Sequence, residues 1–247
     1  MEFVAKSDVG RKRSNNEDSF FAKIYNENIA LFIVADGLGG YASGEVASKI
    51  VTDTISTYVE NNLNFLAAMN SKQIMESIKK VVLEANKKIY SLEKTDVKYD
   101  NMGSTVVLAL KVSNDMYYTS IGDTRLYYIS DKMDKIEQIT IDDTYVNELI
   151  KTRIITEEEA KVHPQRHVLT KAVGITKDLK FNVEKLNKKR GYLLFCSDGL
   201  TNMLEDKEIL EEMNKSDFCN IASALVDVAN KKGGYDNTTV IVVKKGE

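Results

Sequence analysis

Three short apolar runs follow one another closely between residues 103 and 139, and they constrain the fold more than any other feature. They are Thr105–Leu110, Met116–Ile121 and Leu126–Ile129, and they are rich in the β-branched, aromatic and aliphatic residues typical of strands. The connections between them are too short for the crossover helix that neighbouring parallel strands require. The sequence therefore predicts antiparallel pairing in an α+β domain and argues against a doubly wound parallel sheet.

Apolar periodicity predicts the other elements. Further strands are expected at Ile29–Ala35, Tyr192–Cys196 and Thr238–Val243. Helical spacing of apolar residues predicts helices over 43–61, 71–92 and 217–230, and Gly233-Gly234 after the last one is a typical stop signal. Because no linker rich in proline or glycine divides the chain, we expect one domain, residues 1–247, in which helices cover a sheet or a sandwich.

Composition excludes several classes of function. Lys and Arg number 34 and Asp and Glu 37, so the formal net charge of -3 lacks the basic surplus of a protein that wraps nucleic acid. No apolar run approaches the ~20 residues of a membrane-spanning helix. The two cysteines, Cys196 and Cys219, make no disulfide framework, and Met1–Lys6 does not resemble a signal peptide. We therefore expect a cytoplasmic protein without nucleic-acid binding or membrane insertion.

Four aspartates share one kind of position, at the rim of a predicted strand and next to or near a glycine. They are Asp36, Asp123, Asp198 and Asp236. One such aspartate is ordinarily a turn residue. If all four converge, their mutual repulsion must be relieved by cations or protons. Carboxylate oxygens suit Mg²⁺, Mn²⁺ or Ca²⁺ rather than Zn²⁺, and two such ions a few ångströms apart can activate water for attack on phosphorus.

The segment Ser7–Asp18 places basic residues directly before Glu17 and Asp18. By itself it is typical of a solvated loop. Beside a metal cluster, Arg13 can bind two phosphate oxygens in bidentate fashion, and the two carboxylates can hold metal-bound waters.

In these motifs the sequence resembles the bacterial branch of the metal-dependent serine/threonine protein phosphatases of the 2C type, the PPM family. The matching blocks span nearly the whole chain in the family's order: Ser7–Asp18, Val34–Ser48, Met102–Val107, Ile121–Tyr127, His163–Gly174, Leu194–Thr201 and Gly233–Val240. The resemblance implies a sandwich of two antiparallel β-sheets flanked by α-helices on both sides, in α-β-β-α layers.

The resemblance also implies a role for each matching residue. Two ions, Mn²⁺ or Mg²⁺, are expected, with a third, weaker one beside them. Asp36 matches the carboxylate that bridges both metals, and Gly37 matches the residue whose backbone carbonyl binds the second. Asp198 and Asp236 match the ligands of the first metal, and Asp123 joins Asp198 at the third. The remaining matches are Arg13 as the phosphate-binding and catalytic arginine, Glu17 and Asp18 as outer, water-mediated positions, and Asn237 as a further residue facing the site.

The implied activity is hydrolysis of phosphoserine and phosphothreonine in proteins, by a water held between the two metals. A cognate bacterial Ser/Thr kinase and its phosphorylated protein substrates are the implied partners, and we expect a monomer. An alternative from another class is a non-catalytic module that binds phosphoproteins on the same fold. A two-metal phosphodiesterase or nuclease is a third interpretation, but the chain lacks the basic surface expected of such an enzyme.

Some positions depart from the family's pattern. Leu38 stands where some members carry a histidine, and Tyr41 stands where many bacterial members carry one. The general acid therefore has no assigned residue, and a metal-bound water is the expected proton donor. A mobile flap is expected at about 144–159, with Arg153 in place of a glycine. His163 and His167 are interpreted as structural or flap-supporting residues.

Rival motifs fail in context. Residues 37–42 satisfy G-x-G-x-x-A, but a second helix follows where a dinucleotide-binding unit requires a strand. Glu45 stands where a nucleoside-triphosphate loop needs lysine. Neither cysteine has an arginine six positions later, and the two histidines are too few for a histidine-rich phosphoesterase. Ser43 is expected to cap a helix, since no triad surrounds it.

Overall fold

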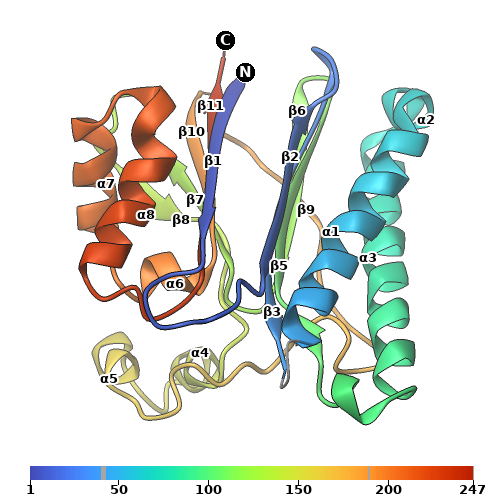
Figure 1. Cartoon of the computed structure of the whole chain (residues 1–247). Helices are drawn as coiled ribbons and strands as arrows, with labels where there is room; N and C mark the ends of the chain where they lie inside the picture. The colour runs from blue at the N-terminus through green and yellow to red at the C-terminus, as the bar shows by residue number, and fades with distance from the viewer. Residues whose placement is uncertain (40–42, 189, 247) are drawn as a thin grey trace.

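Two antiparallel β-sheets face each other, and helices cover the outer face of each sheet (Figure 1). The computed structural model describes residues 1–39, 43–188 and 190–246. The predicted α-β-β-α sandwich is therefore confirmed. Each pair of neighbouring strands within the sheets is antiparallel, as the short connections after residue 103 predict.

The two sheets draw their strands from both halves of the chain. The first has the spatial order β1 (Glu2–Asp8), β11 (Thr238–Lys245), β10 (Gly191–Cys196), β7 (Arg125–Ile129) and β8 (Ile136–Gln138). The second has the order β2 (Asp18–Ile24), β3 (Ile29–Leu38), β5 (Val106–Val112), β6 (Asp115–Ile121) and β9 (Glu184–Lys185), with β4 (Gly103–Ser104) paired to β3.

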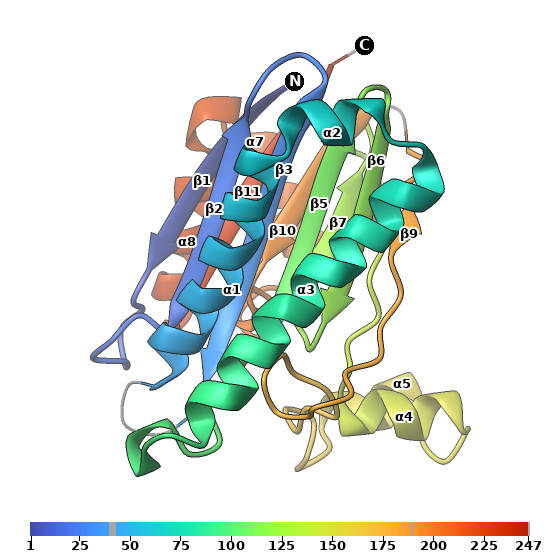
Figure 2. The ribbon, with the colours of Figure 1, turned by 90° about the vertical axis from the view of Figure 1, so that its right-hand side faces the viewer.

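The helices divide between the outer faces and one end of the sandwich. The second sheet is covered by α1 (Ser43–Asn61), α2 (Leu63–Ala68) and α3 (Ser71–Glu93), which leads into the 3₁₀ turn η1 (Val97–Tyr99) (Figure 2). The first is covered by α6 (Asp198–Thr201), α7 (Asp206–Lys215), η2 (Phe218–Asn220) and α8 (Ile221–Lys231). At one end lie α4 (Tyr145–Lys151) and α5 (Glu157–Lys161). None of the helices in the described ranges has the length and apolar character needed to cross a bilayer.

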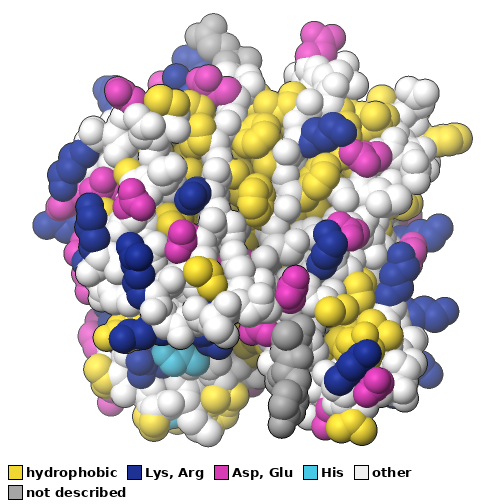
Figure 3. All heavy atoms as spheres, in the orientation of Figure 1, with side chains coloured by type: hydrophobic (Ala, Val, Ile, Leu, Met, Phe, Trp, Pro, Cys, Tyr) yellow, Lys and Arg dark blue, Asp and Glu magenta, His cyan; other side chains and the backbone are white. Residues whose placement is uncertain are grey.

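Strand periodicity assigns side chains to three apolar layers. In β3, Leu31 and Ile33 pack against the helices, whereas Phe32 and Val34 point into the space between the sheets. There Phe32 meets Phe195 of the opposite sheet, with ring centroids 5.9 Å apart. Apolar side chains show along the open edge of the sandwich between β1 and β2 (Figure 3).

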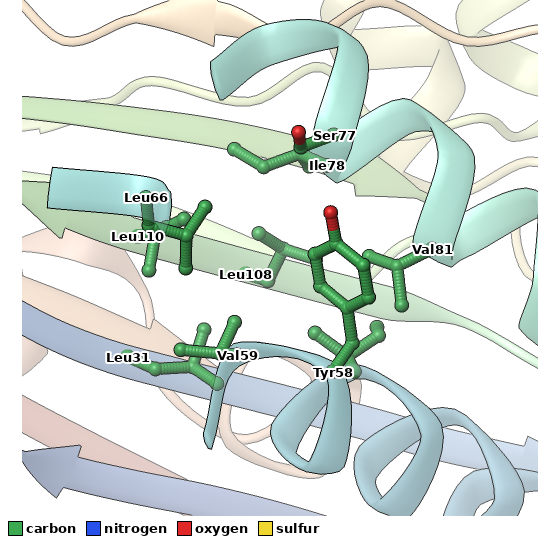
Figure 4. A pocket seen from close by; sticks show the side chains of 10 residues that line it. Leu31, Tyr58, Val59, Leu66, Ser77, Ile78, Val81, Leu108 and Leu110 are labelled. Carbon is green, nitrogen blue, oxygen red and sulfur yellow. The ribbon is translucent and has the colours of Figure 1, made fainter. Parts of the chain in front are cut away.

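A small apolar cavity lies within the helix-covered layer. Leu31, Leu108 and Val81 line it together with Tyr58 and Ser77, from strands β3 and β5 and helices α1 and α3 (Figure 4). Its walls are side chains of the hydrophobic core, so the cavity belongs to packing rather than to a binding site.

Most predicted elements agree with the structure to within two residues, and two differ. The predicted strand Ile29–Ala35 continues to Leu38, because Gly37 and Leu38 pair with Ser104 and Gly103. The predicted helix 217–230 begins with the 3₁₀ turn η2, and the α-helix proper starts at Ile221.

Candidate active site

A cleft of about 340 Å³ opens at the end of the sandwich where β3 leads towards α1 and β10 leads into α6. All of the predicted site residues except Asp18 line it: Arg13, Glu17, Asp36, Gly37, Asp123, Asp198, Asp236 and Asn237. They come from segments far apart in the sequence. The fold therefore brings the four aspartates to one cleft.

The backbone around Asp36 is fixed by its neighbours in the sheet. Its N–H donates to Thr105 Oγ1 at 3.0 Å, and its carbonyl accepts from the Thr105 N–H at 2.8 Å. In the register of β2 and β3, Asp36 lies opposite Asp18. Because β3 extends past Asp36, this carboxylate sits on a rigid strand rather than on a loop.

Gly37 and Gly44 allow β3 and α1 to touch at the base of the cleft. A Cβ atom on Gly37 would lie 2.0 Å from the Gly44 carbonyl oxygen and 2.7 Å from that of Glu17. Both neighbours are backbone atoms, which cannot rotate away. The Gly37 N–H also donates to the Glu17 carbonyl at 3.1 Å. Gly37, the glycine of the Asp-Gly motif, is thus required by the close approach of the β3 backbone to the backbone of Gly44 and Glu17.

Asp18 and Asp198 contribute carboxyl oxygens that have no protein partner. Asp18 Oδ2 accepts from Ser197 Oγ at 2.7 Å, and Ser197 Oγ in turn accepts from the Thr239 N–H at 2.9 Å. Asp198 Oδ2 accepts from Asn202 Nδ2 at 2.9 Å. The other oxygen of each aspartate, Oδ1, is buried and accepts no hydrogen bond from any described residue. Because buried polar atoms are normally satisfied, these two oxygens fit a cation, or a water bound to a cation, as their missing partner.

Burial, and to a smaller extent the neighbouring carboxylates, raises the pKa of these acidic groups. Burial, with smaller contributions from Asp198 and Asp236, raises the pKa of Asp18 to about 7. Burial and the neighbouring Asp198 raise the pKa of Asp123 to about 7. Burial, followed by the charges of Asp18 and Asp198, holds the pKa of Asp36 well above its ordinary range. A bound cation would lower these pKa values by stabilising the ionised carboxylates.

Arg13 and Asp236 form an ion pair at the rim of the cleft. Arg13 Nη2 lies 2.8 Å from Asp236 Oδ2, and half of the arginine side chain is exposed. Asp236 Oδ1 accepts from the Asn237 N–H at 2.9 Å. Among the described residues, no three His, Cys, Asp or Glu side chains already surround one metal position. An ion bound through Asp236 would share a carboxylate oxygen with one of these donors or displace Arg13.

Asn237 does more than face the cleft. Its amide Nδ2 donates to the carbonyls of Val9 at 2.9 Å and Asn15 at 2.8 Å, and its Oδ1 accepts from the Glu17 N–H at 2.8 Å. These three bonds fasten the amino-terminal segment to the start of β11. Asn237 therefore positions the segment that carries Arg13 and Glu17.

His167 was missed as a site residue by the sequence interpretation. It lines the cleft beside Leu169 and Asp198, and no local periodicity signals this placement. His163 instead accepts from the Gln165 N–H through Nδ1, and its ring centroid lies 6.2 Å from that of Tyr145, in keeping with its predicted structural role. Leu38 also lines the cleft, whereas Tyr41 lies outside the described residues.

The predicted flap, residues 144–159, contains α4 and the beginning of α5. It is tied to the sheet where Arg125 Nε and Nη2 lie 3.0 and 2.7 Å from the buried Asp142 carboxylate. Thr144 Oγ1 then caps α4 by accepting from the Asn147 N–H. Arg153 follows α4 with φ of 60°, in the left-handed region that favours glycine. The positive φ explains why a glycine is expected at this position, and this chain adopts the same backbone conformation with an arginine.

The chain is similar to known proteins over nearly its whole length. The family model described as Protein phosphatase 2C matches residues 9–241. A putative protein phosphatase 2C-type of Streptococcus pyogenes serotype M6 is 35% identical, over 98% of this chain and 97% of the relative. The structure of the Mycobacterium tuberculosis serine/threonine phosphatase PstP/Ppp has a TM-score of 0.88 at 31% identity, and the match covers 100% of this chain and 99% of that one.

A further similar structure contains metal ions. It is the catalytic domain of the serine threonine protein phosphatase PstP in complex with two manganese ions, with a TM-score of 0.83 at 30% identity over 98% of this chain and 97% of that one. The family match spans most of the chain, and the relatives are covered almost end to end. The chain therefore belongs to the protein phosphatase 2C family, among the bacterial PPM-type serine/threonine protein phosphatases, as its motifs predict.

Proposed function

We propose that this chain hydrolyses phosphoserine and phosphothreonine in proteins, using two divalent cations, Mn²⁺ or Mg²⁺, held by Asp36, Asp198 and Asp236. The observation that carries the proposal is the buried carboxylate cluster, with raised pKa values and an unsatisfied Asp198 oxygen, beside an exposed arginine. Such a cluster is stable in its ionised form only with counter-charge.

The other residues complete the proposed metal site. Gly37 would offer its backbone carbonyl to the second ion, and Asp123 together with Asp198 would hold a third, weaker ion. Glu17 and Asp18 act from outside, through water. When bound, the cations supply Lewis-acid stabilisation and lower the pKa of water.

Arg13 binds the phosphoryl group in this proposal. Its guanidinium is half exposed at the rim and already pairs with one carboxylate oxygen. Phosphate oxygens are a closely similar partner for the same planar donors. The arginine therefore exchanges Asp236 for substrate, which orients the phosphorus over the carboxylate cluster.

The leaving group needs a proton, and in this proposal His167, rather than a metal-bound water, donates it. Its imidazole lines the same cleft as Arg13 and the aspartates, whereas Leu38 has no proton to donate. Phosphate-monoester hydrolysis requires on the order of 20 kcal/mol of barrier lowering. Positioning supplies about 7–11 kcal/mol of this. Charge stabilisation by Arg13 and by the cations, together with proton donation, must supply the rest.

The proposed setting is the cytoplasm, where the free Cys196 and Cys219 stay reduced. The proposed partners are proteins phosphorylated by a cognate bacterial Ser/Thr kinase. Acidic and basic side chains are interspersed over the face in Figure 3, which offers no broad basic area for nucleic acid. A phosphoprotein-binding module without catalysis is the alternative, and the complete carboxylate set argues against it.

A substrate panel tests the proposal. With excess substrate and Mn²⁺, we expect many phosphates released per protein from phosphothreonine and phosphoserine peptides. We expect about 10²-fold slower release from a phosphodiester such as bis-p-nitrophenyl phosphate, because the proposed role of Arg13 is to bind a doubly charged terminal phosphoryl group. Phosphopeptide binding without release would favour the binding module. Faster cleavage of the diester would favour a phosphodiesterase.

A further inference from the structure

A second groove opens directly beside the cleft that holds the four aspartates. It has a volume of about 540 Å³ and shares Leu38, His167 and Leu169 with that cleft. A phosphoserine or phosphothreonine bound at Arg13 belongs to a longer chain, which must leave the cleft along its walls. The shared residues make this groove a continuous exit.

The floor of the groove is apolar. Leu169, Ala172, Ile175 and Leu179 line it, and Ile175 is 39% exposed. These residues belong to the connection after α5, which passes between the end of α3 and the α4–α5 pair before it rises to β9 (Figure 2). Ala172 and Leu179 are nearly buried, so the floor is held by the core while Ile175 faces outward.

Lysines line the far end of the groove. Lys171, Leu179 and Lys180 also line a further cleft of about 640 Å³, to which Lys79 of α3 belongs. Lys79 and Lys180 are exposed, and neither has an ion-pair partner within the ranges that the structure describes.

The other charged groups along this path carry both signs, and one pair of them forms an ion pair. Lys171 lies 2.6 Å from Asp143, and Glu184 accepts from the Tyr118 hydroxyl at 2.9 Å. Asp178 is the acidic side chain that lines the groove itself. The path from the cleft therefore runs over an apolar floor towards two exposed lysines that form no ion pair with any described residue, and Asp178 and Glu184 are the unpaired acidic groups along it.

We propose that this groove binds the substrate polypeptide on one side of the phosphorylated residue. An apolar side chain next to that residue packs on Leu169 and Ile175, and an acidic side chain further along the peptide meets Lys180 and Lys79. The inference rests on the proposed phosphatase function and narrows its substrates. Its support is the continuity of groove and cleft together with charge complementarity.

Single phosphothreonine peptides test the groove. Each carries alanine at all flanking positions except one, which is Glu or Lys, and that position is moved along both sides of the phosphothreonine. We expect Glu to exceed Lys in kcat/KM by about three- to tenfold at one or two positions, on one side only, because such exposed pairs are individually weak. The ratio should shrink as salt rises.

The double variant Lys79→Glu, Lys180→Glu should reverse this preference. Its hydrolysis of p-nitrophenyl phosphate should be unchanged, because that substrate does not reach the groove. Lys207→Glu, at an 85% exposed lysine on α7, is the matched control and should keep the wild-type preference. Ile175→Asp should lower kcat/KM for a peptide with leucine beside the phosphothreonine, again without affecting p-nitrophenyl phosphate.

Two kinds of failure are distinguishable. Equal kcat/KM for Glu and Lys peptides at every position, or a preference that the double variant leaves unchanged, would overturn the groove while p-nitrophenyl phosphate is still hydrolysed. Absence of hydrolysis of every substrate by the wild-type protein with Mn²⁺ would instead overturn the phosphatase function itself.

Discussion

Replacing Asp36 by asparagine is expected to lower phosphate release by on the order of 10³-fold or more, and at the same time to raise the thermal stability of the metal-free protein at pH 8. Asp36 lies on β3 at the centre of the buried acidic cluster, and its amide counterpart would have nearly the same shape. Activity falls because asparagine cannot supply the negative charge that binds two cations. Stability rises because a buried source of repulsion is removed.

The pH dependence follows from the direction of the pKa shifts. In the unfolded chain an aspartate has a pKa of ~3.9, whereas in the folded protein the pKa values of Asp18 and Asp123 are raised to about 7 and that of Asp36 is raised well above 3.8. The folded state therefore holds these protons more tightly. The protonated aspartates therefore contribute to the free energy of unfolding fully at low pH, and this contribution is lost as pH rises through their folded pKa values. The metal-free protein should accordingly be less stable at pH 8 than at pH 6.

Thermal unfolding in EDTA at both pH values checks this prediction, and the measurement is repeated with Mn²⁺. The wild-type protein should gain more from Mn²⁺ at pH 8, and Asp36→Asn should gain little at either pH. Asp53→Asn, at a 62% exposed aspartate on α1, is the control and should follow the wild type. A variant at Asp36 that keeps full activity, or that unfolds more readily than the wild type at pH 8 in EDTA, would contradict the assignment.

Gly37→Ala is expected to reduce the free energy of unfolding by about 3 kcal/mol or more, because overpacking against backbone cannot be relieved by side-chain rotation. The new Cβ atom would lie 2.0 Å from the Gly44 carbonyl oxygen. Relief requires β3 and the start of α1 to move apart, which would also displace Asp36. Activity should therefore fall with stability.

Urea denaturation measures the loss of stability. Gly246→Ala is the matched control, because its Cβ atom would meet only the amino-terminal nitrogen of Met1, at 3.2 Å, and it should change stability by no more than about 0.5 kcal/mol. A Gly37→Ala protein as stable and as active as the wild type would show that β3 and α1 need no glycine at their contact.

The part of the fold that the sequence predicts well is the part with strong periodicity. The long helices α1 and α3 and the central strands β5 and β10 carry continuous apolar patterns, and their observed bounds lie within two residues of those expected. The edge strands β1 and β2 bury only parts of each side chain, so Glu2–Asp8 and Asp18–Ile24 give no clear alternation. The short helices α4 and α5 depend on their threonine caps rather than on an apolar face.

Some residues of the site can also be predicted from the sequence, and others cannot. The aspartates are predictable because each follows a recognisable strand or motif, and carboxylates that converge at strand ends need a cation or a proton between them. His167 reaches the cleft only because the chain returns to it after α5, which is a tertiary effect without a local pattern. The role of Asn237 in holding the amino-terminal segment also cannot be predicted from the sequence, because its three hydrogen-bond partners come near it only in the folded chain.

The most direct test of the central claim is phosphate release from a phosphothreonine peptide by wild-type protein and by Asp198→Ala, in EDTA, in Mg²⁺ and in Mn²⁺. Asp53→Ala serves as the surface control, and circular dichroism confirms that each variant is folded. We predict release by the wild type and by Asp53→Ala only when metal is present, and none by Asp198→Ala under any condition. Release in EDTA, or wild-type activity in Asp198→Ala, would contradict the carboxylate cluster as the catalytic metal centre.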